Sequence, residues 1–144
     1  MRNVNQILEN KSAAVVTVAK DAPVLDVIRL MAEHHIGSVL IVEAGRLVGI
    51  ATERDYARKV ILQGRSSSDT PVAQIMSSPV VSVSPNDSAQ TCMQIMTDRR
   101  IRHLPVLDAG GGVVGLVSIG DLVKAVIEDQ REEIDQLQRY IAYG

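Results

Sequence analysis

The sequence predicts an α/β (α+β) protein of two pseudo-symmetric β-α-β-β-α repeats packed through their sheets, followed by a C-terminal amphipathic helix. Two observations predict this class. The two halves of the chain repeat each other, and the strand-like runs lack the alternation of polar and apolar residues that is typical of a sheet with one solvent-exposed face. We expect the first repeat over residues 1–64, the second over residues 65–126 and the helix over residues 127–144. In a chain of 144 residues, each repeat is too short to bury a large core alone.

The internal repeat is visible as apolar runs that recur in the same order. Matching residues are 65 to 68 positions apart, and one extra residue in the turn at residues 109–112 accounts for part of this drift. Asp55 in the first half matches Asp121 in the second. The matching runs are residues 4–8 with 72–76, residues 16–18 with 81–83, and residues 48–52 with 114–118.

A strand and a helix open the first repeat. Residues 15–18 form a short β-branched run, and Asp21 is a candidate N-cap for the helix that follows. His34 and His35 stand where this helix is expected to end, and they are best explained as its C-terminal cap. The buried face of the helix is predicted from apolar residues at helical spacing, namely Val24, Val27, Ile28, Met31 and Ala32.

Two further strands are expected over residues 38–42 and 47–51, joined by a turn at residues 43–46. Both runs are almost wholly apolar, which indicates strands buried on both faces. A second repeat packed against the first would bury the face of these strands that the first repeat leaves exposed. Residues 63–71 form a polar connector between the repeats.

The C-terminal tail has its own periodicity. Ile127, Ile134 and Ile141 are spaced by seven, and Leu137 lies at an intermediate apolar position. Two such heptads are too few to predict a coiled coil. We therefore expect an amphipathic helix that docks either on its own module or on a second subunit.

Composition excludes several classes of function. Fifteen basic and seventeen acidic residues give a net charge of −2, and three Tyr are the only aromatic residues, so nucleic acid is an unfavourable partner. No run approaches the about 20 apolar residues of a membrane helix, and residues 1–11 contain no signal-peptide core, so we expect a soluble, cytoplasmic protein. The lone Cys92 lies in a helical pattern and is expected to be a packed thiol, without a disulfide or a metal site.

One short motif carries the chemistry, and it occurs twice. A glycine and two apolar residues precede a hydroxyl residue and, three positions later, an aspartate: Gly49 to Thr52 and Asp55, then Gly115 to Ser118 and Asp121. A capping box at a helix start explains this pattern without any ligand. A strand that ends beside a helix start also presents N–H donors to an anion, while an aspartate can accept hydrogen bonds from two ribose hydroxyls. Both interpretations can hold at once.

These motifs, together with residues 96–106 (Met-Thr-Asp-Arg-Arg-Ile-Arg-His-Leu-Pro-Val) and Ile75-Met76, resemble the CBS domain family in its tandem arrangement, the Bateman module. The resemblance covers about residues 4–126. It implies nucleotide sites in two clefts between the repeats, in which the aspartate holds ribose and the hydroxyl residue helps to hold ribose or phosphate.

The resemblance assigns different residues to the two clefts. The first is expected to use Thr52 and Asp55 for the sugar, Arg102 and His103 for phosphate, and main-chain groups and aliphatic walls around the adenine. The adenine positions carry over to Val16 and Ile36 with the adjoining Gly37, and further to Lys11 and Ser12. The second cleft is expected to use Ser38, Val81, Ser118 and Asp121. Gly37 and Ser38 stand where Arg102 and His103 stand in the other repeat, so the second cleft is expected to bind phosphate more weakly.

The leading hypothesis is a sensor of AMP, ADP, ATP or NAD(H) that regulates a separate partner chain, with no catalytic residues. No nucleophile elbow, metal-ligand spacing or Walker-type loop supports an enzyme. The alternatives are a ligand-free dimerisation scaffold and a module that binds S-adenosylmethionine.

The family usually forms homodimers through the helices that follow each motif. The candidate faces are Tyr56, Ala57, Val60 and Ile61 in the first repeat and Leu122, Val123, Val126 and Ile127 in the second. Packing inside one module would give the same pattern.

Overall fold

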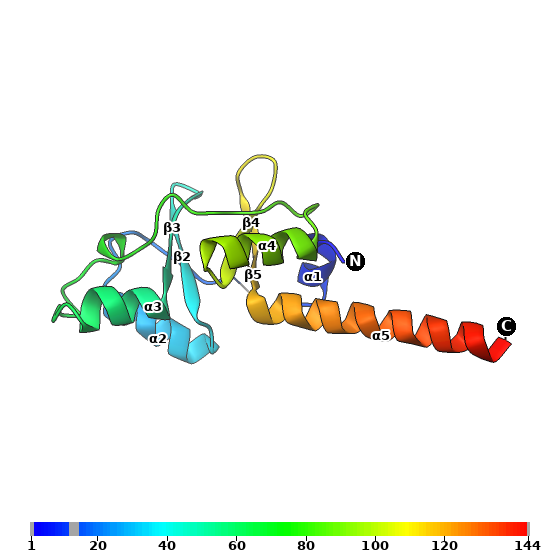
Figure 1. Cartoon of the computed structure of the whole chain (residues 1–144). Helices are drawn as coiled ribbons and strands as arrows, with labels where there is room; N and C mark the ends of the chain where they lie inside the picture. Colours follow the sequence, from blue (N-terminus) through cyan, green and yellow to red (C-terminus); the bar gives the residue numbers. More distant parts are fainter. Residues whose placement is uncertain (1, 12–14, 144) are drawn as a thin grey trace. The chain divides into compact units, whose positions relative to one another are not determined.

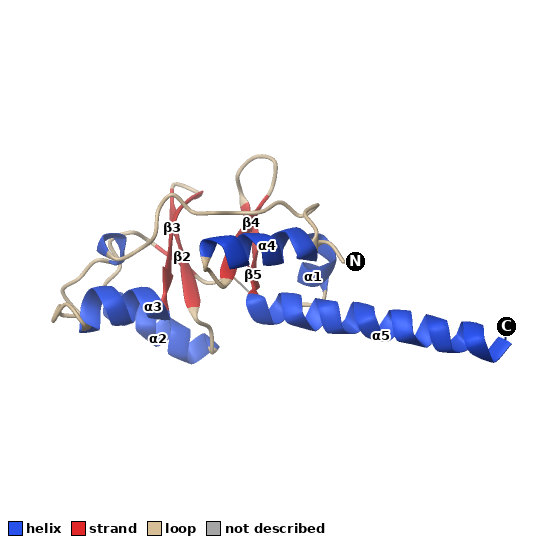
Figure 2. Cartoon of the chain, viewed as in Figure 1, coloured by secondary structure: helices blue, strands red, loops and turns tan. Residues whose placement is uncertain are grey.

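The computed structural model describes residues 2–11 and 15–143, and it contains helices and two small sheets (Figures 1 and 2). The described residues fall into two compact units. We call residues 15–81 and 108–114 the N-unit, and residues 2–11, 82–107 and 115–143 the C-unit.

The N-unit contains a three-stranded sheet in the order β1-β2-β3. Strand β2 pairs in parallel with β1, where Thr17 lies opposite Leu40, and antiparallel with β3, where Ser38 lies opposite Thr52. Ala44 and Gly45 both have positive φ in the tight turn between β2 and β3, as a two-residue hairpin turn requires. The elements are β1 (Thr17–Val18), α2 (Val24–His34), β2 (Ser38–Glu43), β3 (Arg46–Thr52), α3 (Glu53–Tyr56), the π-turn η1 (Ala57–Ile61) and the 3-10 turn η2 (Val72–Gln74).

Helix α2 buries most of the face that its spacing predicts, because Val24, Val27 and Met31 have almost no exposed surface and Ile28 is half-buried. Ala32, which the spacing also places on this face, is exposed. Its start differs from the prediction: Pro23 is the N-cap residue, without a side-chain hydrogen bond, so Asp21 is not the cap. Its end agrees, because His35 closes the helix in the left-handed conformation.

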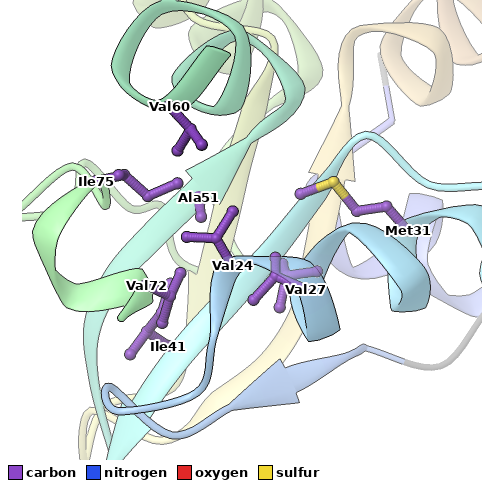
Figure 3. Packing of buried hydrophobic residues seen from close by; sticks show 9 residues of the cluster. Val24, Val27, Met31, Ile41, Ala51, Val60, Val72 and Ile75 are labelled. Carbon is purple, nitrogen blue, oxygen red and sulfur yellow. The ribbon is translucent and has the colours of Figure 1, made fainter. Parts of the chain in front are cut away.

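Two core residues of the N-unit come from the second sequence repeat. Val72 and Ile75 pack with residues of α2, β2, β3 and η1 in one buried cluster (Figure 3). Just beyond them, the main chains of Ser77 and Ile50 exchange two hydrogen bonds of 2.9 and 3.2 Å. The start of the second repeat therefore completes the core of the N-unit.

The C-unit is mainly helical. Helix α5 packs against α1 and α4, and α4 packs against β4. The segment at Val83 adds a parallel bridge to Val106 of β4. The elements are α1 (Val4–Glu9), α4 (Ala89–Arg99), β4 (His103–Leu107), β5 (Val113–Ser118, whose first two residues group with the N-unit) and α5 (Ile119–Tyr143).

Helix α5 is one uninterrupted helix of 25 residues (Figure 1). It joins the helix expected after the second motif to the amphipathic tail expected over residues 127–144. The N-terminal part docks on its own unit, since Leu122 and Ala125 are buried. Ile134 and Leu137 are more than half exposed.

Arg2 fastens the start of the chain to α5. Its guanidinium forms ion pairs with Asp129 and Glu132 at 3.2 and 2.8 Å and donates to the Ala125 carbonyl oxygen at 3.3 Å. The α1 segment comes from the first sequence repeat but belongs to the C-unit. The compact units therefore cut across the repeats over 1–64 and 65–126, because each repeat gives its first segment to the other unit's core.

Candidate functional site

The first motif lies where β3 ends and α3 begins. Asp55 donates its main-chain N–H to Thr52 Oγ1 at 3.2 Å, and Asp55 Oδ2 accepts from the Thr52 N–H and hydroxyl at 3.0 and 3.1 Å. Asp55 is 9% exposed. The carboxylate is thus held in one orientation by the residue that caps its helix.

The second motif repeats this geometry between β5 and α5. Asp121 donates its N–H to Ser118 Oγ at 3.2 Å, and Asp121 Oδ2 accepts from the Ser118 N–H at 2.9 Å. Both motifs are therefore capping boxes, as the ligand-free interpretation predicts. This leaves the outer carboxylate oxygens for other contacts.

Each motif aspartate also meets a lysine. Lys59 lies one turn beyond Asp55, and its ammonium is 3.1 Å from Asp55 Oδ1 and 2.9 Å from the Ile75 carbonyl oxygen. Lys11 follows α1, and its ammonium is 2.8 Å from both Asp121 Oδ2 and the Leu116 carbonyl oxygen. The carboxylate charges are thus balanced within each unit.

The surroundings of Asp121 change its acidity. Burial raises the pKa of this carboxyl, but hydrogen bonds from Lys11 and Ser118 outweigh burial and lower the pKa below its usual value. Asp121 therefore stays ionised, and a carboxylate accepts hydrogen bonds without donating any.

The contacts that the structure gives Lys11 lie within the C-unit. The resemblance puts Lys11 with Asp55, whereas its contacts are with the second motif. Ser12, expected beside it, lies outside the described residues. Sequence reasoning also missed Lys59, although its spacing of four from Asp55 on a helical segment is a signal for an ion pair.

Five more predicted residues lie in the N-unit with Thr52 and Asp55, and four of them are in or before β1 and β2. The Gly37 carbonyl oxygen accepts from the Glu53 N–H at 3.1 Å, and the Val16 carbonyl oxygen accepts from the Leu40 N–H at 3.1 Å. Ile36 is half-buried and immediately precedes Gly37. The start of β2 therefore brings Ile36, Gly37 and Ser38 beside the first motif.

Ser38 is buried, and its hydroxyl has no hydrogen-bond partner among the described residues. Its resemblance-based assignment is to the second cleft with Val81, which is half-buried in the N-unit. A buried hydroxyl without a partner costs about 1–3 kcal/mol, so its position calls for an explanation.

The two cationic candidates lie in the C-unit. His103 is half-buried at the start of β4, and Arg102 precedes it with an exposed side chain. The Arg102 carbonyl oxygen accepts from the Ile119 N–H at 2.9 Å, which fixes this main chain next to the second motif. A shared cleft of Arg102 and His103 with Asp55 stays a prediction, because these residues belong to different units.

A pocket of about 230 Å³ adjoins Asp121 within the C-unit. Its walls come from α1 and α5 and include Lys11, Asp121 and Lys124. Charges of both signs line it.

Cys92 is buried, and burial raises the pKa of its thiol to about 11, so the packed thiol is confirmed. Within residues 2–11 and 15–143, no group of three His, Cys, Asp or Glu is placed to hold a metal ion. None of the described helices is long and apolar enough to cross a membrane.

Comparisons with known proteins agree with the internal repeat. The family model of the CBS domain matches residues 7–61 and again residues 72–128. A mitochondrial CBS domain-containing protein of Arabidopsis thaliana, CBSX3, is 45% identical over 129 residues. The alignment covers 86% of this chain but only 62% of that relative, so the chain spans less than two thirds of it.

Solved structures share the fold. A protein with CBS domains from Burkholderia ambifaria is 52% identical, with a TM-score of 0.85 over 90% of this chain and 96% of that one. The CBS domain protein PAE2072 from Pyrobaculum aerophilum, complexed with AMP, is 24% identical, with a TM-score of 0.75 over 83% of this chain and 89% of that one. Two family matches in phase with the repeat, and relatives that align over most of its length, make this chain a member of the CBS domain family with two copies of the domain.

Proposed function

We propose that the chain is a regulatory module that binds an adenine nucleotide between its two repeats and transmits the bound state to a separate partner protein. The candidate ligands are AMP, ADP, ATP and NAD(H). The observation that carries the proposal is the gathering of Val16, Ile36, Gly37, Thr52 and Asp55 around the start of β2, within one unit.

This gathering suits an adenosine moiety. The oriented carboxylate of Asp55 can accept from ribose hydroxyls, and the aliphatic side chains of Val16 and Ile36 provide apolar walls for a base. The AMP complex of the Pyrobaculum protein has this fold and supports adenosine compounds as the first ligands to test.

The two clefts should differ in their affinity for phosphate. Arg102 and His103 supply cationic donors to the cleft of Asp55, whereas Gly37 and Ser38 occupy the matching positions in the other cleft. Arg102→Ala should therefore weaken AMP binding by about tenfold or more and leave adenosine binding nearly unchanged, since a hydrogen bond to a charged group contributes about 1.5–3 kcal/mol.

The deciding experiment is calorimetric titration with AMP, ADP, ATP, NADH and S-adenosylmethionine. It is repeated on Asp55→Asn and Asp121→Asn, because asparagine keeps a cap acceptor and removes the charge. Asp26→Asn is the control, since Asp26 is an exposed aspartate whose ion pair with Arg29 is 3.9 Å long.

We expect saturable binding of a phosphorylated ligand that is lost mainly in Asp55→Asn. Binding of S-adenosylmethionine alone would favour the alternative ligand, which has no phosphate for Arg102 and His103. An absence of binding to all five ligands would favour the dimerisation scaffold.

We also propose a cytoplasmic homodimer. Ile61, Val123 and Ile127 are 55%, 45% and 43% exposed, and Ala57 is also exposed, so these residues of the predicted faces are accessible to a partner. Val60 and Leu122 are buried within their own units. Sedimentation of wild type and Ile61→Lys should give a dimer and a lighter species, respectively.

A further inference from the structure

Each unit contains the same three-part contact: a motif aspartate, a lysine ammonium and a main-chain carbonyl oxygen. In the N-unit these are Asp55, Lys59 and Ile75, at 3.1 and 2.9 Å from the ammonium. In the C-unit they are Asp121, Lys11 and Leu116, at 2.8 and 2.8 Å. Lys59 has no role in the proposed function, and the resemblance assigns Lys11 only to the adenine of the cleft of Asp55, not to Asp121.

The two lysines do not occupy matching positions in the repeats. Ala125 matches Lys59 in the second repeat, and Pro79 matches Lys11. The same contact is therefore made by lysines from different places in the sequence. The lysine of the N-unit follows its motif, and the lysine of the C-unit precedes its motif. This difference changes which carboxylate oxygen the ammonium contacts.

The hydrogen bonds of Asp55 leave little capacity for a ligand. A carboxylate has about four acceptor positions, two on each oxygen. Oδ2 of Asp55 accepts twice from Thr52, and Oδ1 is held by Lys59, so one position is left. Two hydroxyl groups that donate together to Asp55 need two positions, so either the Thr52 hydroxyl or Lys59 must release the carboxylate. Lys59 is the side chain placed to leave, because it is 44% exposed and its ion pair is on Oδ1, the oxygen that faces away from the cap.

The hydrogen bonds of Asp121 leave more room. Its Oδ2 accepts both from the Ser118 N–H and from Lys11, so neither of these two hydrogen bonds is made to Oδ1. Both positions on Oδ1 are left for a ligand. Two hydroxyl groups can therefore bind Asp121 while Lys11 keeps its place.

We propose that Lys59 is a displaceable competitor for ribose hydroxyls at Asp55, whereas Lys11 is a retained counter-ion at Asp121. This inference rests on the proposed function, because it assumes that the aspartates bind a ribose. It assigns the two lysines different effects on selectivity: Lys59 opposes recognition of the diol, and Lys11 has no effect on it.

The test measures how strongly each site prefers AMP over 2′,3′-dideoxy-AMP, which lacks both hydroxyls. The ratio of the two affinities isolates the diol, because a changed phosphate interaction affects both ligands alike. The Asp55 site is measured in an Asp121→Asn background, with Lys59→Met as the variant. The Asp121 site is measured in an Asp55→Asn background, with Lys11→Met as the variant.

We expect Lys59→Met to raise the ratio about two- to fivefold, the range for removing a half-exposed ion pair. Lys11→Met should leave the ratio at its own site unchanged. Lys20→Met is the control in both backgrounds, because Lys20 pairs with Glu43 at 2.8 Å away from either motif. Lys59→Arg keeps the charge and should keep the wild-type ratio. A rise in Lys59→Met but not in Lys59→Arg then reports the lost charge and not a general effect of substitution at this position.

An unchanged or lower ratio in Lys59→Met, or an equal rise in both methionine variants, would overturn the inference while wild-type binding still upholds the proposed function. No wild-type binding of either ligand would instead defeat the proposed function and this inference together.

Discussion

The main chain of Gly49 lies directly against the side chain of Met76. A β-carbon at position 49 would be 2.3 Å from the Met76 sulfur and 2.8 Å from its Cγ. The matching pair repeats this approach, since a β-carbon on Gly115 would be 2.7 Å from a methyl group of Leu8. The absence of a side chain at the glycine of each motif therefore allows the segment from the other repeat to pack against the main chain.

Gly49→Ala should lower the free energy of unfolding by about 1–3 kcal/mol, because the new methyl group overpacks a filled site. Urea denaturation measures the change, and Gly110→Ala serves as the control, since its β-carbon would meet only Asp108 Oδ1 at 3.5 Å. Adding Met76→Ala should recover part of the loss in a double-mutant cycle. Strict additivity of the two substitutions would contradict this contact.

Arg2→Met should lower the free energy of unfolding by about 1 kcal/mol, and by less in high salt, because Arg2 joins several carboxylates of α5. Arg29→Met removes one exposed pair of 3.9 Å and should change stability by less than about 0.5 kcal/mol. Equal effects of the two variants in urea titrations would argue against the fastening of α1 to α5.

The stability advantage of wild type over Asp121→Asn should depend on pH. The pKa of Asp121 is lowered in the folded chain, so its ionised form is favoured by folding. That contribution is complete well above the unfolded value of about 3.9 and is lost as the pH falls through the folded value. Denaturation between about pH 3 and 7 should show the advantage shrinking toward acid, and an advantage that grows toward acid would refute it.

Cys92 should react very slowly with a disulfide reagent near neutral pH in the folded chain. Its side chain is buried, and a pKa of about 11 leaves roughly one thiol in ten thousand ionised at pH 7. Unfolding in urea should bring the reaction to the rate of a free thiol, measured by absorbance. Rapid modification without urea would show that the helix α4 region opens readily.

Much of the local structure could be predicted from sequence because it depends on neighbours along the chain. The spacing of Val24, Val27 and Met31 identified a buried helix face, and the hydroxyl-to-aspartate spacing identified two capping boxes. The end of α2 at His35 is of the same kind.

The missed features depend on contacts between distant segments. Ile7 and Ile75 are buried in the structure, but the matching runs at residues 4–8 and 72–76 do not indicate which repeat each residue packs against. The partner of Lys11 is likewise 110 residues away in sequence. The boundary expected at residue 127 is absent for another reason: no proline interrupts residues 119–143, so the helix after the second motif continues into the heptads.

The exchange of first segments also constrains how such a chain could arise by duplication. A half-length chain ending near residue 64 would have the sheet and α2 but would lack Val72 and Ile75 from its core. Its core would be complete only if a second copy supplied the equivalent segment, so its folding would depend on protein concentration. When two such copies are joined end to end, the segment and the core that it completes belong to one chain. The segment is then held near that core at a high effective concentration and no longer has to come from a second molecule.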